Sequence, residues 1–157
     1  MRPTILIVDD HAGFRDAARA LLQAEGFDVV GEAVDGVEAL GEVQRLTPDV
    51  VLLDIQLPGL DGFAVAERLA AAGSPSEVVL ISSREASSYG PRLAGAAARG
   101  FLAKADLSGV ALARLLAQRR VAGVEQVGVG ALARAPDSPA DLVELSQPEQ
   151  VGSLDDQ

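Results

Sequence analysis

Four short apolar runs of the sequence end at side chains that together could carry out phosphoryl chemistry. These are Asp9 and Asp10 after residues 5–8, Asp54 at the end of 50–54, Ser82 after 77–81, and Lys104 after 100–103. Three carboxylates brought close together repel one another, so at least one would keep its proton unless a cation intervened. Lys104 adds one positive charge to their three negative ones, which leaves about −2 for a divalent ion to balance. Oxygen ligands favour Mg²⁺, and a hydroxyl and a lysine beside that ion make a phosphoryl site.

Each of these features also has a simpler interpretation. Asp54 could open the turn at Pro58-Gly59, since aspartate favours turns. Adjacent acids often start a helix, Ser82 could be a capping residue, and a single lysine is usually solvated. Lys104 is nevertheless the only lysine beside twelve arginines, and a compact ammonium is not interchangeable with a guanidinium in a small pocket. Each signal is weak, whereas their combination in this order is specific.

The elements that must position these residues alternate between strand and helix. Strands are predicted at 5–8, 27–34, 50–54, 77–81 and 100–103, and the second, which is more polar, is expected near a sheet edge. Helical spacing follows each strand, over about 11–25, 35–46, 62–72, 84–99 and 106–120. Five such repeats predict an α/β fold with a parallel sheet and helices on both faces. The carboxyl ends of parallel strands share one edge, where ligands bind.

Local signals set several helix boundaries. Asp35 followed by Glu38 resembles a capping box, and Thr47 before Pro48 ends that helix. Asp106 is expected to cap the last helix. The segment 84–99 contains Gly90-Pro91 and Gly95, which weaken helices, so we expect it to be the least rigid element.

Length and composition limit the function classes. The chain of 157 residues has a net charge of −10, which argues against nonspecific binding of nucleic acid. It has no cysteine, which excludes disulfides and thiol catalysis. No apolar run is long enough for a membrane span or a signal peptide, so a cytoplasmic protein is expected. Residues 1–120 are predicted to form one domain. Residues 121–157 hold seven acidic residues and one arginine and are predicted to be a mostly disordered tail, in which a short helix around 141–145 is possible.

At this point the sequence resembles a known family, the receiver domain of bacterial two-component response regulators. The resemblance covers about residues 3–120 and rests on four motifs: Ile-Leu-Ile-Val-Asp-Asp at 5–10, Leu53-Asp54 with Pro58-Gly59 and Asp61-Gly62, Ile81-Ser82-Ser83, and Gly-Phe-Leu-Ala-Lys at 100–104. Asp-Asp-His at 9–11 is similar to the LuxR/NarL-like subgroup. The resemblance implies a flavodoxin-like, doubly wound, five-stranded sheet of order 2-1-3-4-5.

The resemblance also implies roles at the carboxylate cluster. Asp54 would be the nucleophile that takes a phosphoryl group from a phosphohistidine of a sensor histidine kinase and becomes an aspartyl phosphate. Asp10 would bind Mg²⁺ directly and Asp9 mainly through water, while Asp54 and the backbone carbonyl of Gln56 would complete the protein ligands. His11 is expected to be an exposed residue at a helix start and is given no role.

Three further residues would respond to the phosphoryl group. The resemblance implies that Lys104 pairs with the phosphoryl oxygens, that Ser82 gains a hydrogen bond to them, and that Phe101 swings inward. Two departures matter here. Ala105 stands where many receivers have proline, which makes a cis peptide doubtful, and Phe101 has no hydroxyl, so its inward state could be read only through shape. Gln56 and Arg84 lie where the family tunes water access to the phosphoryl group.

The expected partner surface is the fourth helix, fifth strand and fifth helix, through which the family binds downstream proteins. It would contain Arg92, Arg99, Arg114, Arg119 and Arg120, which could meet an acidic partner, although a solvated face is the simpler interpretation for each. A helix-turn-helix output domain needs about sixty more residues and a basic face. We therefore expect a stand-alone receiver that acts through protein contacts without binding DNA, and a homodimer is possible.

Other interpretations of the sequence compete with the stand-alone receiver. A Mg²⁺-dependent phosphatase of haloacid dehalogenase type would need an aspartate at the position of Gln56. A flavodoxin-like nucleotide binder would need a glycine-rich loop after the first strand, where only Gly13 is found. A truncated or partner-dependent transcriptional regulator of the same family, or a phosphate reservoir, keeps the receiver but changes its output.

Overall fold

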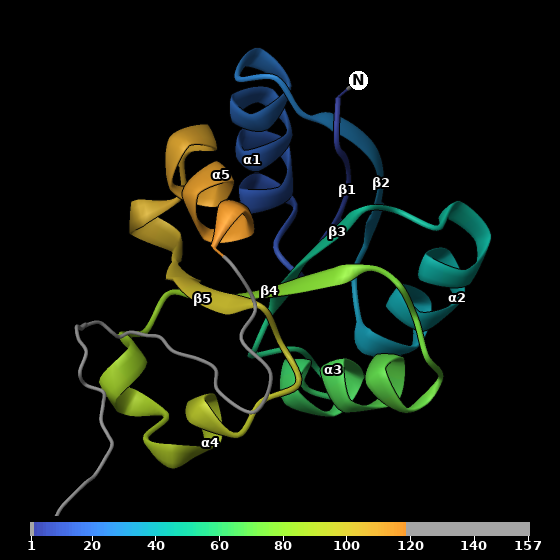
Figure 1. The fold of residues 1–157 in the computed structure, drawn as a ribbon, viewed down its shortest axis with the longest axis vertical. Coiled ribbons are helices and arrows are strands. Elements are labelled where there is room, and N and C mark those ends of the chain that lie inside the picture. The colour runs from blue at the N-terminus through green and yellow to red at the C-terminus, as the bar shows by residue number, and fades with distance from the viewer. Residues whose placement is uncertain (1, 119–157) are drawn as a thin grey trace, which may run out of the picture. The chain divides into compact units, whose positions relative to one another are not determined.

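The computed structural model describes residues 2–118, in which strands and helices alternate (Figure 1). The strands are β1 (Thr4–Val8), β2 (Asp28–Ala33), β3 (Val50–Asp54), β4 (Glu77–Ser82) and β5 (Gly100–Ala103). The α-helices are α1 (Ala12–Ala24), α2 (Gly36–Leu46), α3 (Gly62–Ala71), α4 (Pro91–Ala94) and α5 (Gly109–Ala117), and the 3₁₀ turns are η1 (Ala86–Ser88) and η2 (Lys104–Asp106). Within the same residues no helix is long and apolar enough to cross a membrane.

The five strands form one parallel sheet in the order β2-β1-β3-β4-β5. This confirms the predicted fold class, its strand order and the edge position of β2. The strand β3 lies at the centre with all five residues buried, as expected for an apolar run covered on both faces.

Helices cover both faces of the sheet (Figure 1). The apolar residues of α1 and α5 pack on one face, with Leu22 and Leu112 fully buried. Those of α2 and α3 pack on the other, with Val65 fully buried. Alternate side chains of a strand point to opposite faces, so Leu52 and Leu53 belong to different core clusters.

Side-chain caps start three of the helices. Asp35 Oδ1 accepts from the Glu38 amide at 2.8 Å, and the Glu38 carboxylate accepts from the Val34 amide at 2.7 Å, which confirms the predicted start of α2. The prediction for the last helix was wrong. Ser108, whose Oγ accepts from the Ala111 amide at 3.0 Å, caps α5, while Asp106 lies in the preceding 3₁₀ turn.

The segment predicted as a helix over 84–99 contains little helix. It holds the three-residue turn η1 and the four-residue helix α4, separated by Gly90. Gly90 has a φ of 56°, a left-handed conformation that few other residues adopt, and so a continuous helix cannot pass through it. The breaks at Gly90 and Gly95 were predicted correctly, but the helical length was overestimated. The predicted acidic tail, the helix around 141–145, Arg119 and Arg120 lie outside the described residues.

Candidate functional site

The carboxyl ends of β1, β3, β4 and β5 bring the predicted site residues to one edge of the sheet, here called the C-terminal rim. Strand register sets this alignment: Val8 lies beside Leu53, Asp54 beside Ile81, and Ser82 beside Ala103. The residue that follows each of these strand ends is therefore carried to the same level. Residues separated by about a hundred positions meet at this rim, as the sequence predicted.

Lys104 connects two of the carboxylates. Its Nζ lies 2.5 Å from Asp9 Oδ2 and 3.5 Å from Asp54 Oδ2, and its side chain is only 16% exposed. Asp9 is fully buried and Asp54 almost so. The ammonium also lies 4.6 Å from the centre of the Phe14 ring, a cation–π contact. Lys104 is thus a fixed part of the site and not a solvated loop residue.

Burial and charge together perturb Asp54. Loss of solvent and the nearby Asp9 carboxylate raise its pKa to about 6. Lys104 and the Gln56 amide, which donates to Asp54 Oδ1 at 3.3 Å, oppose the rise without cancelling it. Negative charge is therefore in excess around Asp54, and a bound cation would relieve it.

The same residues could hold a metal ion. Ligand atoms of Asp9, Asp10, His11 and Asp54 all lie within 4.8 Å of one another. A set dominated by carboxylate oxygens suits a hard cation such as Mg²⁺. Sequence reasoning gave His11 no role, but its Nδ1 lies 3.2 Å from Asp9 Oδ1 and 3.1 Å from Asp10 Oδ1. Its position directly after two acids was the signal that pointed to this contact.

The loop after Asp54 is tightly packed. The amide of Gly62 donates to the Ile55 carbonyl at 2.9 Å, which folds the loop back onto the end of β3. A Cβ at position 62 would lie 2.5 Å from the Asp54 carbonyl oxygen and 2.7 Å from Ile55 Cα. The start of α3 can approach the strand only because residue 62 has no side chain. Asp61 caps this helix by accepting from the Ala64 amide at 2.9 Å.

Ser82 has partners that sequence reasoning did not predict. Its Oγ lies 2.5 Å from the Tyr89 hydroxyl and accepts from the Arg84 amide at 3.0 Å. The Tyr89 ring contacts Phe63 edge-on, with centroids 5.8 Å apart, and Phe101 at 6.3 Å. Tyr89 is the only tyrosine of the chain, which was the one available signal, but nothing in the sequence indicated which residue it would contact.

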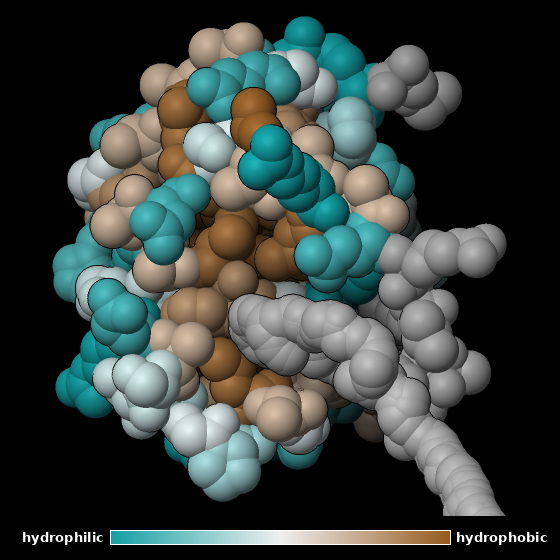
Figure 2. Space-filling view, turned by 60° about the vertical axis from the view of Figure 1, so that its left-hand side comes forward, coloured by the Kyte–Doolittle hydropathy of each residue, from teal (hydrophilic) through white to brown (hydrophobic). Residues whose placement is uncertain are grey.

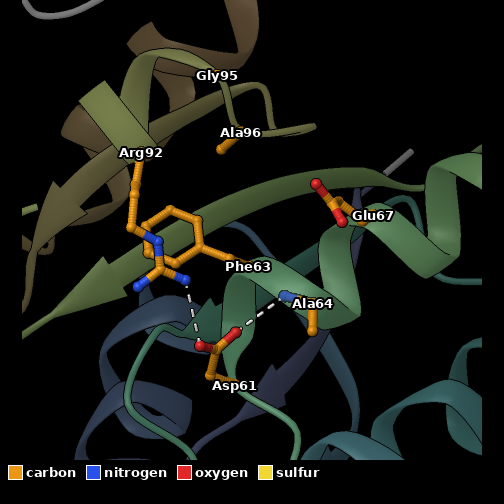
Figure 3. Close-up of a pocket in the computed structure, with 7 residues that line it drawn as sticks. All are labelled: Asp61, Phe63, Ala64, Glu67, Arg92, Gly95 and Ala96. Atoms are coloured by element: carbon orange, nitrogen blue, oxygen red, sulfur yellow. Dashed lines mark hydrogen bonds and ion pairs between the residues drawn. The ribbon is translucent and has the colours of Figure 1, made fainter. Parts of the chain in front are cut away.

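A second anchor holds the segment around α4. The Arg92 guanidinium lies 4.3 Å from the centre of the Phe63 ring and 3.4 Å from Asp61 Oδ2, at the edge of a cavity of about 380 Å³ (Figure 3). Arg99 pairs with Glu77 at 3.2 Å and donates to the Leu116 carbonyl at 2.8 Å. Arg92 and Arg99 are therefore engaged within the domain. Arg99 is largely covered, which differs from the expected solvated face, whereas Arg92 and Arg114 are exposed on the surface predicted for partners.

Comparison with known proteins identifies relatives of this chain. The family model "response regulator receiver domain" matches residues 5–117. The chain is 43% identical over 147 residues to protein-glutamate methylesterase/protein-glutamine glutaminase 5 of Myxococcus xanthus, covering 90% of this chain and 41% of that protein. It is 36% identical over 101 residues to response regulator GacA of Pseudomonas viridiflava, covering 64% and 47%.

The fold comparison agrees with the sequence comparison. The crystal structure of a LuxR-family two-component response regulator from Aurantimonas sp. SI85-9A1 matches with a TM-score of 0.67 at 26% identity, covering 78% of this chain and 91% of that one. The chain spans about half the length of the curated relatives that it matches.

Proposed function

The chain belongs to the family of response regulator receiver domains, and we propose that Asp54 is its phosphoacceptor, taking a phosphoryl group from a phosphohistidine of a sensor histidine kinase. Receivers of this family are phosphorylated on an aspartate in two-component signalling. The observation that carries the assignment to Asp54 is its placement: a buried carboxylate at the end of the central strand, 3.5 Å from the ammonium of the only lysine.

In the proposed transfer, a carboxylate oxygen of Asp54 forms a bond to phosphorus as the phosphorus–nitrogen bond of the donor breaks. The electron pair of that bond leaves with the donor imidazole, which then takes up a proton. Lys104 lies close enough to pair with the phosphoryl oxygens, where its charge counts most in a site from which water is largely excluded. The product is a mixed anhydride on Asp54, and the chain acts as an acceptor and switch with no enzymatic turnover proposed.

Magnesium is the proposed cofactor. Asp10 would hold it directly, Asp9 mainly through water, and Asp54 and the Gln56 carbonyl would complete the protein ligands. When bound, Mg²⁺ supplies positive charge that stabilises the equatorial oxygens of the phosphoryl group. The clustering of Asp9, Asp10 and Asp54 supports this assignment, as does the raised pKa of Asp54, because both create a need for a cation.

The proposed output is a change in protein contacts. Ser82 and Lys104 would be drawn toward the added phosphoryl charge, and Phe101 would turn inward with β5. The surface that changes is the side of the molecule with α4, β5 and α5, where β5 is an edge strand whose four residues are half-buried. Figure 2 brings this side forward and shows apolar surface in a hollow between polar side chains. An unidentified downstream protein, or a further module as in the transcription regulators among the relatives, is the proposed recipient.

The test is phosphorylation by acetyl phosphate with Mg²⁺, measured by the mass of the intact protein and by its loss on treatment with hydroxylamine. Asp54→Asn should abolish the added phosphoryl mass. The matched control is Asp16→Asn, an exposed acid on α1, which should be labelled like the wild type. Undiminished labelling of Asp54→Asn would show that another residue is the acceptor.

A further inference from the structure

The Tyr89 side chain contacts Ser82, the serine proposed to respond to the phosphoryl group. The Tyr89 hydroxyl lies 2.5 Å from Ser82 Oγ, and the Arg84 amide donates to the same oxygen at 3.0 Å. Ser82 is fully buried, and within residues 2–118 these are its side-chain hydrogen bonds. Neither Asp54 nor Lys104 is among its partners. The serine hydroxyl is thus engaged on the side of α4 and not on the side of the carboxylates.

The position of Tyr89 is fixed by its surroundings. Its amide donates to the Ala86 carbonyl at 3.1 Å, which closes the η1 turn, and its ring lies between Phe63 and Phe101. Edge-on aromatic pairs of this kind stabilise a defined ring orientation. The hydroxyl is therefore presented to Ser82 by contacts that do not involve Ser82 itself.

We propose that Tyr89 is a positioning residue that holds Ser82 away from the acceptor and must release it once Asp54 carries a phosphoryl group. This inference rests on the proposed function. A serine hydroxyl has one proton to donate, and the oxygens of an ionised phosphoryl group only accept. Ser82 must therefore donate its proton to the phosphoryl group, and it can do so only by turning Oγ from the side of α4 toward the carboxylates, which separates it from the Tyr89 hydroxyl. A hydrogen bond to an ionised acceptor is about twice as strong as a neutral one, so the phosphoryl group outcompetes the tyrosine.

Release of Tyr89 would transmit the event to α4. The segment 86–94 is held by Tyr89 on one side and by Arg92 on the other, and both contact Phe63. Once the hydroxyl is free, the ring loses this hydrogen bond and keeps its contacts with Phe63 and Phe101. Tyr89 therefore couples Ser82 to Phe101 and to the segment 86–94 through direct contacts.

The chain carries its own reporter for this event. Tyr89 is the only tyrosine and the chain has no tryptophan, so its tyrosine absorbance and tyrosine fluorescence come from this residue alone. Phosphorylation by acetyl phosphate with Mg²⁺ should shift the wild-type tyrosine spectrum. Ser82→Ala should show the shifted spectrum before phosphorylation and little further change after it. Ser83→Ala, an exposed neighbour, should behave like the wild type. A wild-type spectrum that stays unchanged while the phosphoryl mass appears would overturn the inference and leave the proposed function standing.

A second variant tests the direction of the effect. Tyr89→Phe keeps the ring contacts and removes the hydroxyl, so Ser82 loses its competing partner. With beryllium fluoride and Mg²⁺ as a phosphoryl mimic, we expect this variant to bind about 3- to 10-fold more tightly than the wild type, the effect of one neutral hydrogen bond. Equal or weaker binding would overturn the inference. Absence of both mimic binding and phosphoryl mass in the wild type would instead reject the proposed function, and the inference with it.

Discussion

The two sides of the C-terminal rim are built differently. On the side of β1 and β3, Asp9 and Asp54 are buried among strands that are paired on both edges, and the loop after β3 is packed against the start of α3. On the side of β4 and β5, an edge strand of four half-buried residues adjoins a segment with only seven residues in helical turns. The first arrangement suits chemistry that needs fixed groups, and the second suits a part that must move.

The contacts that hold each side differ in kind. Backbone hydrogen bonds and fully buried apolar side chains hold the first side, and these are lost only by unfolding. On the second side, the segment 86–94 contacts the rest of the domain through side chains, among them those of Tyr89 and Arg92, which contact Phe63. Such contacts are each worth about 1 kcal/mol, so a new charge–dipole interaction at Ser82 is large enough to exchange them.

The strongest test of this difference is a matched pair of glycine substitutions. Gly62→Ala should destabilise the protein by about 3 kcal/mol, because its Cβ would lie 2.5 Å from the Asp54 carbonyl oxygen and the backbone there cannot move aside. Gly95→Ala should change stability by less than about 0.5 kcal/mol, since its nearest neighbour, the Pro91 carbonyl oxygen, is at 3.7 Å. Urea unfolding followed by circular dichroism measures both values. Equal effects would show that the two sides are packed alike.

The second test measures how the unfolding free energy depends on pH in the absence of a divalent cation, and it concerns Asp54 on the side of β1 and β3. The pKa of Asp54 is raised to about 6, so the folded state holds this proton more tightly than the unfolded chain does. Stability from this group is therefore present below about pH 4 and is lost as the pH rises through 6. The loss should be about 2–3 kcal/mol in the presence of a chelator.

Asp54→Asn supplies the control for this prediction. The asparagine cannot ionise, so the difference in unfolding free energy between wild type and variant should change between pH 4 and 7 and then stay level. Adding Mg²⁺ at pH 7 should stabilise the wild type more than the variant, because the cation offsets the charge that burial makes unfavourable. A difference that does not depend on pH would mean that Asp54 is not in an environment that disfavours its charge.

The same contrast explains what could be predicted from the sequence. The strands and the meeting of Asp9, Asp54 and Lys104 at one edge followed from short apolar runs that end in polar residues, because parallel strands leave little freedom in where their ends lie. The family resemblance supplied the strand order. The length of α4 did not follow, since apolar spacing over 84–99 indicated a helix that Gly90 interrupts.

Side-chain contacts on the side of β4 and β5 could not be predicted from the sequence. The contact of Tyr89 with Ser82 depends on how an irregular segment returns over the rim, and no periodic pattern records that path. The ion pairs of Arg92 and Arg99 could not be predicted for the same reason, because their acceptors come from other elements. The wrong cap, Asp106, is a smaller case: Ser108 lies two residues further on and competes for the same role.

The smallest expected effect concerns Arg92, which holds the segment around α4 on the side of β4 and β5. Arg92→Gln removes the cation over Phe63 and the ion pair with Asp61, which should lower the unfolding free energy by about 1 kcal/mol and speed amide hydrogen exchange in residues 86–98. Arg45→Gln is the matched control, since Arg45 is exposed to a similar degree, 64% against 60%, and pairs with Glu42 on the surface of α2. It should cost less than about 0.5 kcal/mol and leave that exchange unchanged. If both variants altered exchange in 86–98 equally, Arg92 would be an ordinary surface charge with no special role in holding the segment.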